Sequence, residues 1–87
     1  MRRGHRVDAN QAEIVEALRA AGRTVQVISQ VGKGCPDLAV GLQGRTFLLE
    51  VKVPGAKLTE DERRWHLAWR GQVAVVTTPQ EAIEATR

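Results

Sequence analysis

The amino-acid sequence predicts a small α/β domain in which a mixed sheet is flanked by helices. Helix start and stop signals mark three segments, and short runs with apolar residues at strand spacing lie between them. Two of these runs are separated only by Gln43 and Gly44, which favours a β-hairpin. The chain has 87 residues, 43% hydrophobic and 26% charged, which is the length and composition of one globular domain. We therefore expect residues 1–87 to share a single core.

The N-terminal segment, residues 1–7, is expected to be a loose basic arm, because it carries charge without apolar periodicity. A helix is expected to begin near Gln11, with Asp8 or Asn10 accepting its first amide hydrogens, and to stop at Gly22. Its apolar residues recur at helical spacing and form one inward stripe: Ile14, Ala17, Leu18 and Ala21.

Strands are expected in the following part of the chain. Residues 24–29 alternate as a short strand, and its expected inward residues are Val25, Val27 and Ile28. Glycines and a proline punctuate residues 30–36, the linker that is long enough to be mobile. Residues 38–42 and 45–53 then form the two arms of the hairpin.

Helix signals return in the second half. Thr59, followed three residues later by Glu62, matches a capping box and predicts a helix that continues to about Arg70. Residues 72–77 are predicted to form a strand. A second cap signature then introduces a last short helix, through Thr78, Pro79 and Glu81. The predicted order is α, β, β, β, α, β, α, which fits a mixed sheet with an antiparallel hairpin and helices packed on it.

The charge balance favours a polyanionic partner. Lysine and arginine outnumber acidic residues 13 to 10, and the net charge is +3 with a pI near 9.8. A single cysteine, Cys35, excludes an internal disulfide framework and fits a reducing compartment. No apolar run approaches the roughly 18 residues of a membrane span, and no signal peptide is evident. We expect a cytoplasmic protein without membrane contact.

The hairpin places ionic residues together. A turn centred on Gln43 and Gly44 pairs residues whose numbers add to 87, so Asp37 lies opposite Glu50 on one face of the sheet. Lys52, two residues beyond Glu50, shares that face. The alternate residues turn toward the core: Phe47, Leu49, Val51 and Val53. Leu48 lies on the ionic face and indicates that this face is partly covered, so we expect the charges to lie in a recess.

A divalent cation is the simplest reason for two facing carboxylates. Asp37 and Glu50 supply hard oxygen ligands for Mg²⁺ or Mn²⁺, and the Val51 carbonyl lies between Glu50 and Lys52. A metal there polarises a phosphodiester and acidifies a bound water, while Lys52 steers that water or stabilises charge on the phosphate. The alternative is structural: Asp37 caps the turn after Pro36, and the other two decorate a solvated strand.

The stretch GCPDLAVGLQGRTFLLEVKVPGAKLT resembles the signature of the PD-(D/E)xK nucleases, and in particular of the compact, phage-like, stand-alone VRR-Nuc (virus-type replication-repair nuclease) domains. It contains Pro36-Asp37, a spacer of 12 residues, and Glu50-Val51-Lys52. The flanking GxGxPDL and PGxKLT segments make the likeness more specific than the bare motif, and it extends from about Asp8 to Ile83.

The resemblance implies an αβββαβ restriction-endonuclease-like core, a Mg²⁺ or Mn²⁺ site on Asp37 and Glu50, and Lys52 as the catalytic lysine. It also implies an acidic metal ligand on the first helix. Glu13 fits that place best, Glu16 is the alternative, and helix geometry does not decide between them.

One departure from the family pattern lies in the second helix. Relatives commonly carry glutamine where this chain has Glu62, whose capping role needs no catalysis. The extra charge is expected to alter metal affinity or weaken DNA binding, with no effect on the group of Asp37, Glu50 and Lys52.

Candidate DNA contacts come from basic residues near the site or in the arm: Lys33, Lys57, Arg63, Arg64, Arg70, Arg2, Arg3 and Arg6. Solvated surface charge explains each of them equally well. Trp65 and Trp69, one helical turn apart, are interpreted as core or subunit interface, with base stacking as the alternative. His66 is a candidate general base or ligand, although a histidine on a helix surface is the commoner case.

The function expected from these residues and from the resemblance is metal-dependent endonucleolytic hydrolysis of phosphodiester bonds in structured or branched DNA, of the Holliday-junction-resolvase or flap type. The resemblance further implies a phage or repair role, in a bacterial or phage-infected cell. A two-fold symmetric junction is best cut by two sites, which predicts a homodimer. One alternative is a nucleic-acid-binding module that keeps the nuclease fold without efficient cleavage. The other is an unrelated small α/β interaction domain.

Overall fold

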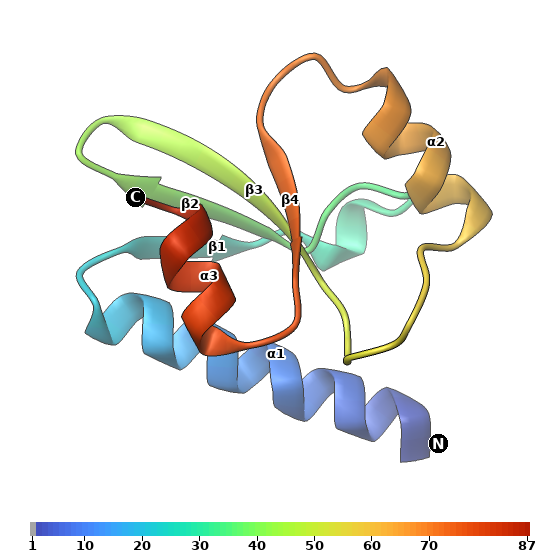
Figure 1. Ribbon diagram of the computed structural model, residues 1–87, viewed down its shortest axis with the longest axis horizontal. Helices are drawn as coiled ribbons and strands as arrows, with labels where there is room; N and C mark the ends of the chain where they lie inside the picture. Colours follow the sequence, from blue (N-terminus) through green and yellow to red (C-terminus); the bar gives the residue numbers. More distant parts are fainter. Residues whose placement is uncertain (1) are drawn as a thin grey trace.

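The computed structural model describes the backbone of residues 2–87 and the side chains of residues 9–87. Its elements follow the chain as α1 (Arg2–Ala20), β1 (Thr24–Val27), the 3₁₀ turn η1 (Ser29–Val31), β2 (Leu38–Leu42), β3 (Arg45–Val51), α2 (Glu60–Ala68), β4 (Val73–Val76) and α3 (Pro79–Ala85). This order confirms the predicted α/β arrangement, shown in Figure 1. Within the described residues, no helix is long and apolar enough to cross a membrane.

The four strands form one mixed sheet in the order β1-β2-β3-β4. The β1–β2 and β2–β3 pairs are antiparallel, whereas β3 and β4 run parallel. Leu38 pairs with Leu49, which is the predicted hairpin register. Gln43 and Gly44 have positive φ angles of 52° and 79°, as a tight two-residue hairpin turn requires. The turn and the alternation of apolar residues together fix which side chains face the core.

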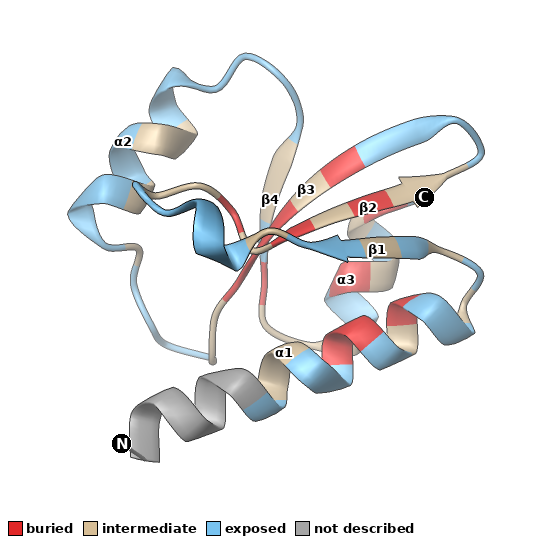
Figure 2. Cartoon of the chain, turned by 180° about the vertical axis from the view of Figure 1, so that it is seen from behind, coloured by how far each residue is buried: buried red, intermediate tan, exposed pale blue. Residues whose placement is uncertain are grey.

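The core lies between one face of the sheet and the helix pair α1 and α3. Its buried residues are Ile14, Val15, Leu18, Leu38, Val40, Phe47, Leu49, Val51, Val76 and Ala82. Figure 2 shows the buried positions gathered where α1, α3 and the sheet meet. Because strand side chains alternate, packing Leu49 and Val51 against the helices turns Glu50 to the opposite face.

The N-terminal helix begins earlier than predicted. It starts at Arg2 rather than near Gln11, so the prediction of a loose arm over residues 1–7 is wrong, and neither Asp8 nor Asn10 is its N-cap. The Asn10 side chain instead donates hydrogen bonds to the carbonyls of Lys52 (3.1 Å) and Thr77 (3.4 Å). Asn10 therefore ties α1 to the residues that directly follow β3 and β4, a contact that helix signals in the sequence do not predict.

The first strand is shorter and more exposed than predicted. β1 ends at Val27, which is 45% exposed, so its assignment to the core is wrong. β1 is one of the two edge strands of the sheet, and Val25 is the β1 side chain that packs against the core. Edge strands have one neighbour, so alternation predicts burial less reliably there.

Helix α2 lies on the other side of the sheet from α1 and α3 (Figure 1). Thr59 and Glu62 form the predicted capping box, and α2 has no buried residue. Trp65 is half-buried and stacks on Trp69, with ring centroids 4.6 Å apart. Trp69 is 44% exposed. The assignment of the two tryptophans to the core is therefore wrong.

Candidate active site

The end of the hairpin holds Asp37 in a fixed position. Its backbone N–H donates to the Leu49 carbonyl (3.0 Å) and so continues the ladder one residue beyond β2. Its side-chain Oδ2 accepts a hydrogen bond from the Val51 N–H (2.8 Å). The Asp37 carboxylate is thus attached to the strand that carries Glu50 and Lys52, as the predicted register requires.

Glu50 is the most buried charged group of the site. Only 2% of the residue is exposed, so the ionic face of the sheet is covered at this position. Burial first, and then the negative charges of Asp37 and Glu62, together raise the pKa of the Glu50 carboxyl to about 9 against the opposing effect of Lys52. Without a cation, Glu50 is therefore a neutral acid at pH 7.

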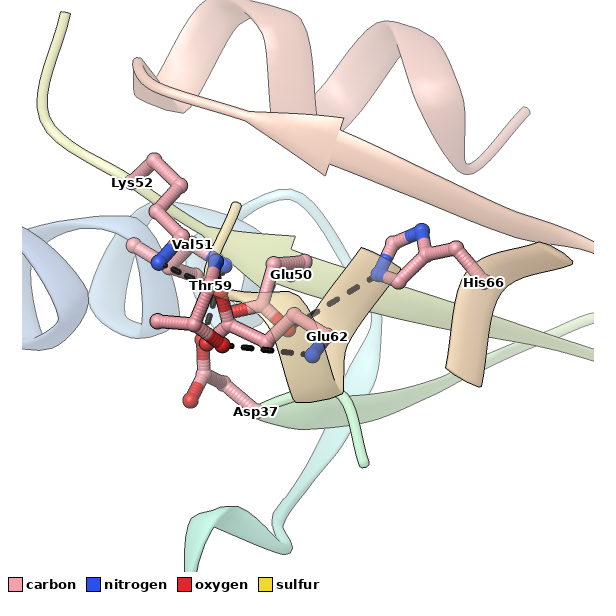
Figure 3. A network of polar contacts seen from close by, with 7 residues as sticks. All are labelled: Asp37, Glu50, Val51, Lys52, Thr59, Glu62 and His66. Carbon is pink, nitrogen blue, oxygen red and sulfur yellow. Dashed lines mark hydrogen bonds and ion pairs between the residues drawn. The ribbon is translucent and has the colours of Figure 1, made fainter. Parts of the chain in front are cut away.

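Lys52 meets a third carboxylate. Its Nζ lies 2.7 Å from Glu62 Oε1, and both side chains are mostly shielded from solvent. The prediction that Glu62 leaves the group of Asp37, Glu50 and Lys52 untouched is wrong. Glu62 Oε1 also accepts the Thr59 N–H (2.8 Å), because the capping box folds this side chain back toward the start of α2. That start lies over the end of β3, where Lys52 projects (Figure 3).

The pKa of Glu62 reflects these contacts. Burial acts to raise it, but the Lys52 ammonium and the Thr59 N–H outweigh burial, so the pKa is lowered. Glu62 is therefore ionised at neutral pH and adds a negative charge beside Glu50.

His66 completes the network from one turn further along α2. Its Nε2 lies 3.9 Å from Glu50 Oε1. Both atoms are shielded from solvent, and neither has a hydrogen-bond partner. Buried polar atoms without partners are uncommon and costly, so their meeting at a candidate site calls for an explanation. The spacing of Glu62 and His66, four residues apart on one helix, is the sequence signal that puts both on the face turned to the site.

The glycine-containing loop of residues 30–36 packs against the start of α2 through Gly34. Gly34 has a φ of 84°, and a methyl group there would collide with the Asp61 carbonyl and come within 2.9 Å of the Glu62 nitrogen. Cys35 follows, and burial raises the pKa of its thiol, with further effects from the carboxylates of Glu50 and Asp37. The loop is therefore a wall of the site as well as a linker.

The two helix glutamates are not joined to this network. Glu13 and Glu16 are both exposed on α1. Glu16 lines a surface hollow with Gln11, Val15 and Val27 on the β1 side of the helix. Among the described side chains, the hydrogen bonds and ion pairs of Asp37, Glu50 and Lys52 include neither glutamate. The choice between Glu13 and Glu16 as a ligand stays a prediction.

The predicted DNA contacts lie on the surface. Lys33, Lys57, Arg63, Arg64 and Arg70 are exposed. Arg63 and Arg64 share Glu60 as ion-pair partner, at 2.9 and 3.2 Å. The side chains of Arg2, Arg3 and Arg6 lie outside the described residues.

The donor set fits a hard divalent cation, although the carboxylates are engaged elsewhere. No three of the described His, Cys, Asp and Glu side chains form a ready metal cluster. Asp37 Oδ2 accepts a hydrogen bond from the Val51 N–H, and Glu62 pairs with Lys52. Glu50 Oε1, however, is a buried oxygen without a partner. A cation would supply that partner and offset the crowding of negative charge that raises the pKa of Glu50.

Comparisons with known proteins bear on this site. No family model matches the sequence, and neither does any curated protein. A solved structure described as "VRR_NUC domain" matches with a TM-score of 0.74 and 28% identity, over 90% of this chain and 90% of that chain. The chain belongs to the VRR-Nuc domains. Membership of the PD-(D/E)xK superfamily follows, and the match indicates a nuclease domain. It also sets aside the alternative of an unrelated interaction domain.

Proposed function

We propose that this VRR-Nuc domain is a Mg²⁺- or Mn²⁺-dependent deoxyribonuclease that hydrolyses phosphodiester bonds in branched or otherwise structured DNA. One observation carries the proposal: Asp37, Glu50 and Lys52 lie close together at the end of the hairpin, none of them exposed, and Glu50 Oε1 is left without a partner. A structural ion pair would not leave that oxygen without a partner, whereas a site that takes up a cation together with a phosphate would leave it free to bind the cation.

The roles follow from the position of each group. Asp37 and Glu50 would hold the metal, with the Val51 carbonyl and Glu13 as proposed further ligands, and Glu16 as the alternative to Glu13. A divalent cation held there would supply Lewis-acid chemistry, namely polarisation of the phosphodiester and a lowered pKa of a bound water. Lys52 lies two residues beyond Glu50 beside these carboxylates, where its ammonium would steer the attacking water or stabilise charge that develops on the phosphate oxygens. The Val51 N–H donates a hydrogen bond to the Asp37 carboxylate and so fixes its position.

The exposed basic residues support binding of a DNA backbone around Asp37, Glu50 and Lys52. Lys33 lies in the loop that walls the site, and Lys57 precedes α2. Arg63 and Arg64 extend the positive surface along α2, reduced by their shared Glu60. Arg2, Arg3 and Arg6 stay candidates for the same backbone contact.

We further propose that the domain works as a homodimer in the cytoplasm. Large apolar side chains are exposed on α2 and on the sheet face beneath it: Leu67 (75%), Trp69 (44%) and Val75 (45%). A small domain gains stability by covering such residues, and two copies present two sites to a two-fold symmetric junction. A monomer at micromolar concentration in light scattering would contradict this part of the proposal.

A second function has one specific observation in its favour. The ammonium of Lys52 already forms an ion pair with Glu62 at 2.7 Å. This pair neutralises the positive charge that cleavage would use. A domain arrested in this state would bind DNA without cutting it efficiently.

Cleavage assays separate the two functions. Labelled four-way junction, flap and duplex DNA are incubated with the protein in Mg²⁺, Mn²⁺ or EDTA, beside Asp37→Asn and Lys52→Ala. Metal-dependent cutting that is lost in both variants is the expected result. DNA binding without cutting would support the second function, and cutting that survives both substitutions would contradict the proposed site.

A further inference from the structure

Helix α2 has an unusual contact surface for a helix in a small domain. It turns Glu62, Trp65 and His66 inward and has no fully buried residue. Two of these three inward side chains are polar, and both end at residues of the proposed active site (Figure 3). A helix attached to a protein only for stability usually presents an apolar stripe. The polar face of α2 therefore calls for a reason beyond stability.

The first polar contact joins Glu62 to Lys52. The carboxylate is held twice, by the Thr59 N–H at 2.8 Å and by Lys52 Nζ at 2.7 Å. Because the capping box fixes the carboxylate, the ammonium at the end of a flexible four-carbon chain is restricted to one place.

The second polar contact joins His66 to Glu50. Nε2 and Oε1 face each other at 3.9 Å, and both are shielded and without partners. A small shift of α2 toward the sheet would bring them to hydrogen-bond distance. The two contacts thus pair each ionic member of Glu50-Val51-Lys52 with its own residue on α2.

We infer that α2 positions the active site, with Glu62 orienting the Lys52 ammonium and His66 orienting the Glu50 carboxylate. The inference deepens the proposed nuclease function and rests on it. Glu62 and His66 are positioning residues, which act on the reaction through Lys52 and Glu50. The close approach of Gly34 to Asp61 sets how near α2 lies to the hairpin.

The test compares removal with conservative replacement at each position. Glutamine at residue 62 keeps an oxygen that accepts from Lys52 and Thr59, and glutamine at residue 66 keeps a nitrogen donor with about the reach of Nε2. Glu62→Ala is expected to lower kcat on junction DNA at least tenfold with little change in KM, and Glu62→Gln to restore it to within threefold. His66→Ala is expected to weaken Mn²⁺ binding at least threefold in calorimetry, and His66→Gln to retain it.

Controls separate positioning from helix stability. Glu60→Ala removes an exposed acid in the same turn of α2 that contacts Arg63 and Arg64 instead of the site; it is expected to keep the kcat of the unchanged protein, with any effect of the released arginines on DNA affinity confined to KM. A second pair covers the case in which the alanine variants at 62 and 66 fail to fold. Gly32 and Gly34 both have positive φ, but only at Gly34 would an added methyl group meet α2. Gly34→Ala is expected to lower kcat at least tenfold relative to Gly32→Ala.

The outcomes distinguish this inference from the proposed function. Unchanged kcat in Glu62→Ala and unchanged Mn²⁺ affinity in His66→Ala, in folded proteins, would overturn the inference while cleavage by the unchanged protein upholds the nuclease. If the unchanged protein binds Mn²⁺ but cuts no DNA, the nuclease proposal fails. Loss of Mn²⁺ affinity in His66→Ala, restored by His66→Gln, would then still support the positioning of Glu50.

Discussion

Replacing Glu50 by glutamine is expected to stabilise the metal-free protein while removing its activity. Glu50 is 2% exposed, and burial together with the charges of Asp37 and Glu62 raises its pKa from 4.5 to about 9. A carboxyl whose pKa is higher in the folded state makes its full contribution to stability below pH 4.5. That contribution is lost as the pH rises toward the folded pKa, because the unfolded chain releases the proton first.

The magnitude follows from the span of pH. Each pH unit above the unfolded pKa costs about 1.4 kcal/mol, so at pH 7 the metal-free protein is less stable by roughly 3 kcal/mol than it would be with a neutral side chain. Glutamine has nearly the shape of the protonated acid and does not ionise. The free energy of unfolding of Glu50→Gln should therefore exceed that of the unchanged protein by up to about 3 kcal/mol at pH 7, with a difference that vanishes near pH 4.5.

Urea denaturation in EDTA between pH 5 and 8 measures this difference, and Glu84→Gln, at an exposed position of α3, is the matched control. Addition of Mn²⁺ should stabilise the unchanged protein, by about 2.7 kcal/mol at a hundredfold excess over Kd, and should act far less on Glu50→Gln. Parallel stability curves for the two proteins across this pH range would refute the reasoning, because Glu50 would then ionise alike in the folded and unfolded chains.

Three further predictions concern other contacts. Asn10→Ala removes the hydrogen bonds to the carbonyls of Lys52 and Thr77 and should cost about 1–2 kcal/mol in urea denaturation. The Arg23 guanidinium donates to the carbonyls of Ala21, Ile83 and Thr86 and to Thr86 Oγ1. Arg23→Ala should therefore lower the free energy of unfolding by roughly 2–3 kcal/mol. Arg23→Lys should regain little of that stability, because one ammonium cannot replace the several donors of a planar guanidinium. A smaller loss than in Arg19→Ala, which breaks a single exposed hydrogen bond to the Val25 carbonyl, would count against this prediction. Lys33→Ala should weaken DNA binding and reduce the salt slope by about 1, whereas Arg45→Ala at the far end of the hairpin should leave the slope unchanged in fluorescence titrations.

The hairpin and its charges could be predicted because they obey local rules. A two-residue turn at Gln43 and Gly44 and strict alternation around Phe47 and Leu49 leave one register, and that register brings Asp37 to Glu50. The capping box at Thr59 likewise fixed the start of α2. A pattern that repeats every two residues or spans one helical turn carries its own geometry, without knowledge of the rest of the chain.

What escaped prediction depends on distant contacts. The start of α1 at Arg2, the exposure of Val27 and the position of the tryptophans are set by which element packs on which. The N-cap expected at Asn10 has the right chemistry, but that amide lies inside α1 and binds Lys52 and Thr77, 42 and 67 residues away. Tertiary packing overrides a weak local signal in such places.

Glu62 shows why a sufficient local explanation can hide a functional contact. Its role in the capping box accounts for its residue type without reference to the site, and that account is correct: its Oε1 accepts the Thr59 N–H. The same fold-back that makes the cap, however, aims the carboxylate at the end of β3, where Lys52 Nζ meets the same oxygen. Glutamine would serve the cap equally well, so the cap does not explain why the side chain is charged. Glutamate and glutamine at this position differ in charge but not in the oxygen that accepts from Thr59 and Lys52, so Glu62→Gln isolates the contribution of the charge, whereas Glu62→Ala removes the positioning contact itself.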